Sequence, residues 1–208
     1  MSLMTGWGYT ITDADELAPI IQEAEFDELT AGKYAGDQRT APMTTAASTA
    51  IRNFCGWHLY PAQKCTFAGW VGVTRNITRT GCEILMQLPA KYVSMVQGVT
   101  INGIAVDPTD CLLETNGLLH IIYRAASNYE KIEVSYTAGL PDALMGAIKE
   151  LAANRITNAL ANSYGVTSEA AGGVSITDNA TWAASAKATA LADDNKEALA
   201  PYKLIGVF

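Results

Sequence analysis

The alternation of apolar and polar positions divides the chain into a helical third, a strand-rich third and a second helical third. Near the start, Thr12 followed three residues later by Asp15 predicts a helix that begins with a capping box. Apolar residues follow at helical spacing, namely Leu17, Ile20, Ile21 and Ala24. A second helix is predicted from Thr44 to Cys55, and Gly56 is expected to end it as a C-cap.

The stretch from Trp57 to Thr137 has the pattern of short strands separated by turns. The predicted extended runs are Trp57–Tyr60, Phe67–Thr74, Glu83–Leu88, Val93–Ile101, Ile104–Val106, Cys111–Leu113, Leu118–Tyr123 and Ile132–Tyr136. The pairs Asn102-Gly103 and Asn116-Gly117 each predict a two-residue hairpin turn, because type I′ turns need positive φ at both central positions. Strands at this spacing indicate an antiparallel sheet.

Pro141 stands at a position that suits the first turn of a helix, and this helix is predicted to run over 141–162. One face of it is traced by Leu144, Ile148, Leu151, Arg155 or Ile156, and Ala159. A glycine-bearing loop, Gly165 to Asn179, separates it from a further helical region over 180–200. The pattern therefore predicts an α+β fold, in which N- and C-terminal helices form a helical bundle and a central antiparallel β-sheet is inserted.

Composition narrows the classes of function. The chain is 49% hydrophobic and 17% charged, which is enough apolar material for a buried core. Its formal net charge of −7 disfavours a protein that grips nucleic acid, since such proteins usually present a basic stripe. The longest basic cluster is only Arg75 and Arg79. An acidic ring that lets DNA pass without binding it is compatible with this charge.

The sequence contains no motif typical of an active site, a phosphate-binding loop or a calcium loop. The four cysteines stand at positions 55, 65, 82 and 111 and show no zinc-ligand spacing. Cys55 lies three residues before His58, but a helix end followed by a strand is expected to point the two side chains apart. No catalytic residue, metal site or cofactor is therefore predicted.

No secretion signal precedes the first predicted helix, and no apolar run reaches the length of a membrane span. The plain interpretation of the cysteines is free thiols in a reducing cytoplasm. The leading Met1-Ser2-Leu3 before Met4 is interpreted as a vector-derived segment and is left out of the predicted fold.

Five segments in a fixed order resemble the head–tail connector (adaptor) proteins of tailed bacteriophages and prophages. They are TAIRNFCGWHLYP at Thr49–Pro61, LPAKYVSMVQGVTINGIAV at Leu88–Val106, VSYTAGLPDAL at Val134–Leu144, the pair Ser168-Glu169, and ALAPYK at Ala198–Lys203. The resemblance covers about Thr44 to Tyr202. It implies a connector-like domain over 44–208, with its β-rich middle at 57–137, and leaves 1–43 as an N-terminal extension with a helix.

The resemblance implies a non-enzymatic structural protein that forms a homo-oligomeric ring below the portal, joins the DNA-filled head to the tail and extends the DNA channel. Its expected partners are the portal protein and head-completion or tail proteins, while DNA passes through without specific binding. The free protein could be monomeric, and its expected location is the virion, or the host cytoplasm during assembly. Two alternatives remain open, which are another head-completion or tail-completion protein and a β-rich ligand-binding module.

The loop Gly165–Asn179 is either a solvent loop or an arm that orders on a neighbouring molecule, with residues 174–176 adding a short strand. The predicted interaction residues are Gly165, Ser168, Glu169, Gly172, Gly173, Val174 and Ile176. A second hypothesis makes Trp57, Tyr60 and Tyr136 core residues that join the sheet to the helices.

Overall fold

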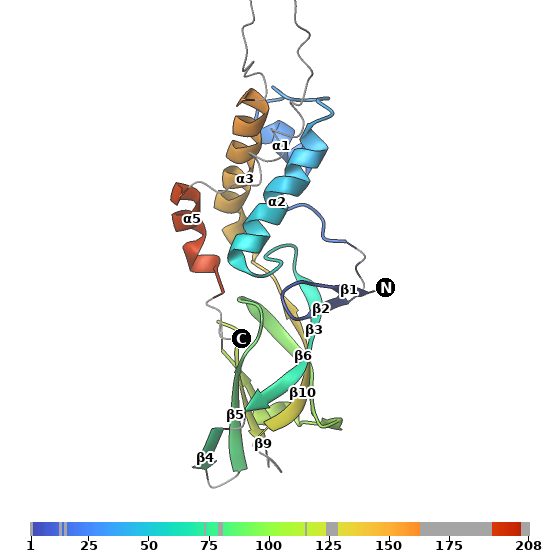
Figure 1. Cartoon of the computed structure of the whole chain (residues 1–208), viewed down its shortest axis with the longest axis vertical. Coiled ribbons are helices and arrows are strands. Elements are labelled where there is room, and N and C mark those ends of the chain that lie inside the picture. Colours follow the sequence, from blue (N-terminus) through green and yellow to red (C-terminus); the bar gives the residue numbers. More distant parts are fainter. Residues whose placement is uncertain are drawn as a thin grey trace, which may run out of the picture. The chain divides into compact units, whose positions relative to one another are not determined.

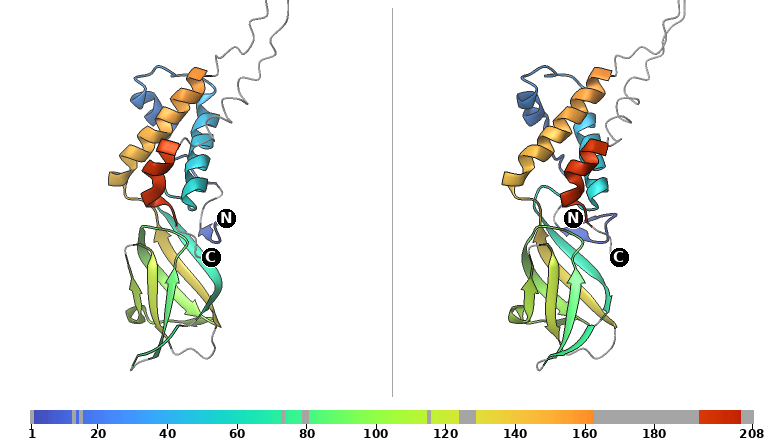
Figure 2. Two further views of the ribbon diagram at one scale, coloured as in Figure 1. Left: turned by 60° about the vertical axis from the view of Figure 1, so that its left-hand side comes forward. Right: turned by 90° about the vertical axis from the view of Figure 1, so that its left-hand side faces the viewer.

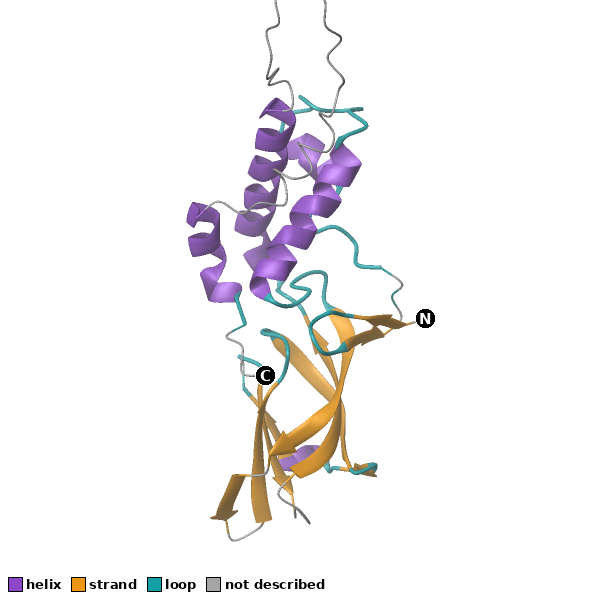
Figure 3. Cartoon of the chain, viewed as in Figure 1, coloured by secondary structure: helices purple, strands orange, loops and turns teal. Residues whose placement is uncertain are grey.

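The computed structural model describes residues 2–12, 14, 16–72, 74–78, 81–114, 116–123, 129–162 and 193–204. It combines helices with antiparallel sheets, which confirms the α+β class (Figures 1 and 3). The chain divides into two compact units. The β unit comprises Met1–Leu17, Gly56–Pro141 and Tyr202–Phe208, and the helical unit comprises Ala18–Cys55 and Asp142–Pro201.

The helical unit contains α1 (Glu23–Leu29), α2 (Thr40–Cys55), α3 (Asp142–Asn162) and α5 (Asp193–Leu199), and the short helix η2 (Ala200–Tyr202) follows α5. Helices α2 and α3 lie side by side, and α1 and α5 contact them (Figure 2). Their core is built from Phe26, Met43, Ala47, Ile51, Met145, Ile148, Ala152, Ile156, Leu160 and Leu199. The two long predicted helices are confirmed, although α2 begins four residues earlier than expected. Gly56 ends α2 with φ of +78°, as a C-cap glycine does.

The helix predicted to start at Thr12 is wrong, because Thr10–Thr12 forms strand β2. Pro19 lacks the amide N–H that a helix interior needs, and the chain stays extended past it before α1 begins. The capping box exists ten residues later, where Gln22 N donates to Glu25 Oε2 at 3.0 Å. Of the apolar residues at helical spacing, Ile20 and Ile21 are buried in a non-helical segment, whereas Ala24 is exposed in α1.

The β unit contains two antiparallel sheets. The six-stranded sheet has the order β1 (Ser2–Met4), β2, β3 (Gln63–Gly72), β10 (Tyr129–Ala138), β6 (Val93–Ile101) and β7 (Ile104–Ala105). The four-stranded sheet has the order β4 (Thr74–Thr78), β5 (Gly81–Gln87), β9 (Leu118–Tyr123) and β8 (Cys111–Leu113), and the short helix η1 (Pro108–Asp110) precedes β8. The leading residues thus take part in the sheet, through the pairing of β1 with β2.

Strand β10 is the centre of the six-stranded sheet, and it pairs with β3 over its whole length, from Tyr129 opposite Gly72 to Ala138 opposite Gln63. Its predicted alternation is confirmed, because Ile132, Val134 and Tyr136 are fully buried while the intervening side chains face solvent or the sheet margin. This period of two is what one buried sheet face requires.

The hairpin at Asn102-Gly103 is also confirmed, with φ of +52° and +79° at the two turn residues. The second predicted two-residue turn is wrong. Glu114 N donates to Leu118 O, so three residues lie between the paired positions, and Gly117 N closes the turn on Glu114 O. Gly117 has φ of +83°, which suits the left-handed residue of a three-residue hairpin loop.

The extended strand predicted at Trp57–Tyr60 is wrong as well, because no strand is formed between α2 and β3. Trp57, His58 and Leu59 are all fully buried, whereas the predicted alternation of a half-buried strand would bury only every second side chain. Leu59 has φ of +61°, so the chain turns there. Trp57 and Tyr136 are core residues of the β unit as expected, whereas Tyr60 is half-buried.

Candidate interaction surfaces

The outer face of the four-stranded sheet carries exposed apolar side chains where an antiparallel sheet usually presents polar ones to water. Leu85, Leu112 and Ile122 are 46%, 64% and 42% exposed. Leu85 on β5 and Leu112 on β8 both lie opposite His120 on the central strand β9, so the three side chains form one row across three strands. The inner face of the same strands is buried and apolar, through Ile84, Met86, Leu119 and Ile121. We call this surface the outer face of β5–β9–β8.

His120 is held at the middle of this face by two carboxylates. Its Nδ1 lies 2.8 Å from Glu83 Oε1, and its Nε2 lies 2.9 Å from Glu114 Oε1. Because ionised carboxylates only accept hydrogen bonds, both contacts are hydrogen bonds at the same time only when the ring is protonated and each nitrogen donates. The hydrogen bond to Glu83, with that to Glu114, raises the pKa of His120. The arrangement ties β5, β9 and the residue after β8 together by charge.

A second exposed patch lies on the outer face of the six-stranded sheet. Trp70 on β3 is 71% exposed, and Tyr129 on β10 is 67% exposed. Tyr129 lies opposite Gly72, two positions along β3 from Trp70, so both rings project from the same face. Lys131, directly opposite Trp70, is exposed beside them. Large aromatic side chains are enriched at protein contact surfaces relative to the rest of the surface.

The chemically richest cluster is buried. His58 is fully buried, and its backbone N–H donates to the Tyr9 hydroxyl at 3.0 Å. A carbonyl only accepts, so Nε2 donates to the Ala138 carbonyl at 2.8 Å, and in the neutral ring Nδ1 then accepts from the Tyr9 hydroxyl at 2.8 Å. These bonds fix the Nε2–H tautomer of a neutral ring. A histidine that solvent does not reach and whose two nitrogens are both hydrogen-bonded organises the core of the β unit.

Burial also makes the Cys65 thiol and the Tyr136 hydroxyl poor nucleophiles. Burial raises the pKa of the Cys65 thiol to about 12 and raises the pKa of the Tyr136 hydroxyl as well. A nucleophilic cysteine needs the opposite shift, toward the thiolate at neutral pH. Among the described residues, no group of three or more histidine, cysteine, aspartate or glutamate side chains has the arrangement of a metal site.

The predicted arm lies outside the described residues. The residues outside the described part include the loop at 165–179, with all seven predicted interaction residues, and the predicted helical segment over 180–191. The end of that helical region is confirmed, since Asp193–Leu199 forms α5. The arm therefore stays a prediction.

Sequence reasoning missed the outer face of β5–β9–β8 and the Trp70 patch. The run EILMQL at residues 83–88 is nearly continuous in apolar residues, and a strand with one buried face needs only every second one. Leu85 is the additional apolar residue in this run, and it could have indicated that the second face of the strand is apolar as well. The row it forms with Leu112 depends on pairing between strands, which the sequence pattern does not contain.

No family model and no curated protein sequence matches this chain. Among solved structures, a chain from a structure titled "Neck of empty GTA particle computed with C6 symmetry" is similar, with 16% sequence identity and a TM-score of 0.47. The match covers 96% of this chain and 97% of that chain. No helix in the described part of the chain combines the length and apolar character of a membrane span.

Proposed function

We propose that this chain is a structural, non-enzymatic protein of the head–tail neck of a phage-like particle. It assembles as a homo-oligomeric ring below the portal, joins the DNA-filled head to the tail and extends the DNA channel. One observation carries the proposal, and it is the ordered set of segments that resemble head–tail connectors. Three of these segments fall on distinct elements in chain order. TAIRNFCGWHLYP ends α2, LPAKYVSMVQGVTINGIAV forms β6 and β7, and VSYTAGLPDAL joins β10 to α3.

Two kinds of surface support an assembly role. A closed ring needs heterologous contacts, in which two different patches of the same subunit meet. The outer face of β5–β9–β8 and the Trp70 patch are apolar or aromatic surfaces on two different sheets. The predicted arm at 165–179 supplies a third contact, to a neighbouring subunit or to the portal, and orders when it binds.

The charge of the chain suits a channel component. With a net charge of −7, the ring repels DNA phosphates and lets the DNA slide rather than bind. The partners are the portal protein above and head-completion or tail proteins below. The protein is located in the virion and, during assembly, in the host cytoplasm.

The test is light scattering after size exclusion over a wide concentration range, followed by negative-stain imaging, with the protein alone and mixed with the portal protein from the same genome. A closed ring with a central hole, formed alone or on the portal, is expected. A protein that stays monomeric with the portal but binds a tail protein instead would favour the alternative of a tail-completion protein. A protein that associates with neither would refute the neck role.

A further inference from the structure

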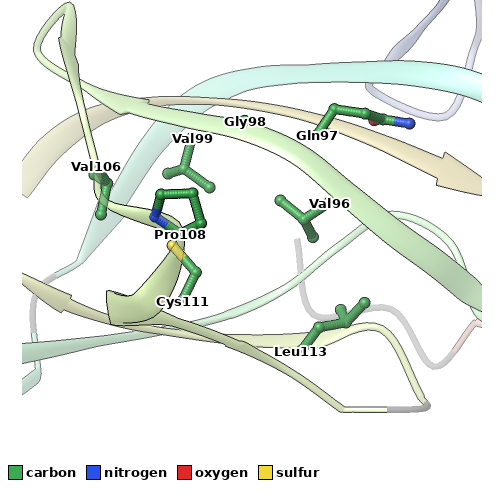
Figure 4. Close-up of a pocket in the computed structure, with 8 residues that line it drawn as sticks. All are labelled: Val96, Gln97, Gly98, Val99, Val106, Pro108, Cys111 and Leu113. Carbon is green, nitrogen blue, oxygen red and sulfur yellow. The ribbon is translucent and has the colours of Figure 1, made fainter.

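A groove in the β unit lies between strand β6 of the six-stranded sheet and strand β8 of the four-stranded sheet (Figure 4). It holds a pocket of about 190 Å³ whose walls are mainly apolar. The side chains that line it are Val96, Val99, Val106, Pro108, Cys111 and Leu113. Val96 and Leu113 point toward each other across it, and the segment with Val106 and Pro108 closes one end (Figure 4).

Both long walls of the groove are sheet edges. Over the described residues, β6 pairs with β10 on one side, from Val93 to Ile101. On the other side it pairs with β7 at Thr100 and Ile101, and Val99 O accepts from Val106 N at 2.9 Å. The stretch 93–98 of β6 is therefore an open edge. Strand β8 is the last strand of its own sheet, with β9 on one side. Open strand edges offer backbone donors and acceptors that an added strand can use.

Backbone as well as side chains forms the β6 wall. The Gln97 side chain turns away from the groove, where its Nε2 donates to Thr137 Oγ1 at 2.5 Å, so this residue lines the pocket with its main chain (Figure 4). Gly98 has no side chain and does the same. A bulge falls here, because Ser135 lies opposite Gly98 while Tyr136 lies opposite Val96, which leaves Gln97 without a counterpart on β10.

Two carboxylates, Asp107 and Asp110, lie near Cys111 at one end of the groove. The pKa of the Cys111 thiol is raised by burial and by the nearby charges of Asp110 and Asp107. Asp107 is the N-cap of η1 and Asp110 is its last residue, and both are exposed. A bound segment that carries a positive charge at that end would therefore complement the two aspartates.

We propose that this groove binds an extended segment of a partner protein, which adds as a strand to the open edges of β6 and β8. The segment inserts apolar side chains at alternate positions and places a lysine or arginine beside Asp107 and Asp110. Main-chain hydrogen bonds to the edges supply affinity, and the apolar pocket and the two aspartates supply selectivity. The proposal requires no ring and is independent of the neck function.

The probe is a synthetic octapeptide, acetyl-Lys-Thr-Val-Thr-Val-Thr-Val-Lys-amide, titrated into the full chain. Two matched peptides serve as controls, one with both lysines replaced by glutamate and one N-methylated at alternate residues, so that one of its two sides can no longer donate to a strand edge. Amide chemical shifts at Val96, Gly98 and Leu113 report where the peptide lies. Alkylation of Cys111, resolved by mass spectrometry, reports whether the pocket is covered. The lysine peptide is expected to bind, to shift these amides and to protect Cys111, whereas both control peptides bind weakly.

Three variants complete the test. Val96→Lys puts a charge into the pocket and is expected to weaken peptide binding about tenfold or more. Met95→Lys, one position away on the outer face of the same strand, is the matched control and leaves binding unchanged. Asp110→Asn is expected to weaken the lysine peptide about two- to fivefold, as a rim charge does, and to leave the glutamate peptide no weaker.

No binding of the lysine peptide at millimolar concentration would overturn the proposal, as would binding that Val96→Lys does not weaken. Self-association of the chain that Val96→Lys abolishes, in the absence of peptide, would also overturn it, because the occupant would then be a second copy of this chain.

Discussion

The burial of Trp57 makes a strong prediction when it is set beside Trp70, which is exposed on the same unit. Trp57 is 0% exposed and its Nε1 donates to the Tyr202 carbonyl at 2.8 Å, whereas Trp70 is 71% exposed. A buried tryptophan removes about 150–250 Å² from water. At about 25 cal/mol per Å² this corresponds to roughly 4–6 kcal/mol. Because the unfolded chain already buries part of that area, we expect Trp57→Ala to lower the free energy of unfolding by about 3–5 kcal/mol.

The matched control is Trp70→Ala, for which a change within about ±0.5 kcal/mol is expected. Trp57→Phe separates the ring from its N–H group. It keeps most of the apolar volume but leaves the Tyr202 carbonyl without this donor, so a loss of about 1–2 kcal/mol is expected.

Because the chain has two units, the assay is urea unfolding followed residue by residue through the amide resonances of β10 and α3, with circular dichroism as the global signal. The loss of stability in Trp57→Ala should appear in the unfolding transition of the β10 amides. Equal effects of Trp57→Ala and Trp70→Ala would refute the reasoning, because the difference in burial would then have no energetic consequence.

Three further predictions concern Tyr136, His120 and the predicted arm. Tyr136→Phe should leave the free energy of unfolding unchanged or raise it by about 1 kcal/mol, measured by urea unfolding, because the buried Tyr136 hydroxyl has no hydrogen-bond partner in the described structure. The folded-state pKa of His120 is raised above its ordinary 6.5, so its stabilising contribution is complete below about pH 6.5 and is lost as pH rises through the folded pKa. The free energy of unfolding, measured at pH values from about 5 to 9, should fall with rising pH in the wild type, and this fall should be absent in His120→Gln. Deleting 170–174 should leave the fold intact, judged by circular dichroism, but abolish ring or portal association.

Each has an outcome that contradicts it. A loss above about 1 kcal/mol for Tyr136→Phe would mean that the hydroxyl has a partner after all. Stability that rises with pH in the His120 window would reverse the sign of the argument. Unchanged assembly after the deletion would remove the arm from the interface.

The sequence was sufficient where a single period governs a whole element. Strand β10 buries Ile132, Val134 and Tyr136 on one face, and this alternation is visible without any knowledge of its neighbours. Helix α2 is equally local, because its apolar stripe and the glycine after Cys55 lie within one continuous segment. In both cases the chain itself contains the information, in the spacing of its apolar residues.

The sequence was misleading where burial is not periodic. Trp57, His58 and Leu59 alternate in polarity like a strand, yet all three are buried, because the bonds of His58 to Tyr9 and Ala138 come from segments 49 and 80 residues away. Such partners satisfy a buried imidazole that otherwise faces solvent. The predicted helix at Thr12 failed for a related reason, since β1 pairs with this segment and the pairing outweighs its helical spacing.

The candidate surfaces were the least predictable part, because each is a product of strand register. Leu85 and Leu112 are 27 positions apart by their residue numbers, and they meet only because both lie opposite His120 on β9. A shift of one residue in either pairing would turn the leucine concerned into the core and bring a core residue to the surface. The Glu83–His120–Glu114 bridge holds that register from both sides, since it exists only when all three strands are aligned as they are. The same charge cluster that makes stability depend on pH therefore also keeps the apolar row on the outer face. We accordingly expect His120→Gln to weaken assembly as well as to flatten the pH dependence, if this face is a subunit contact.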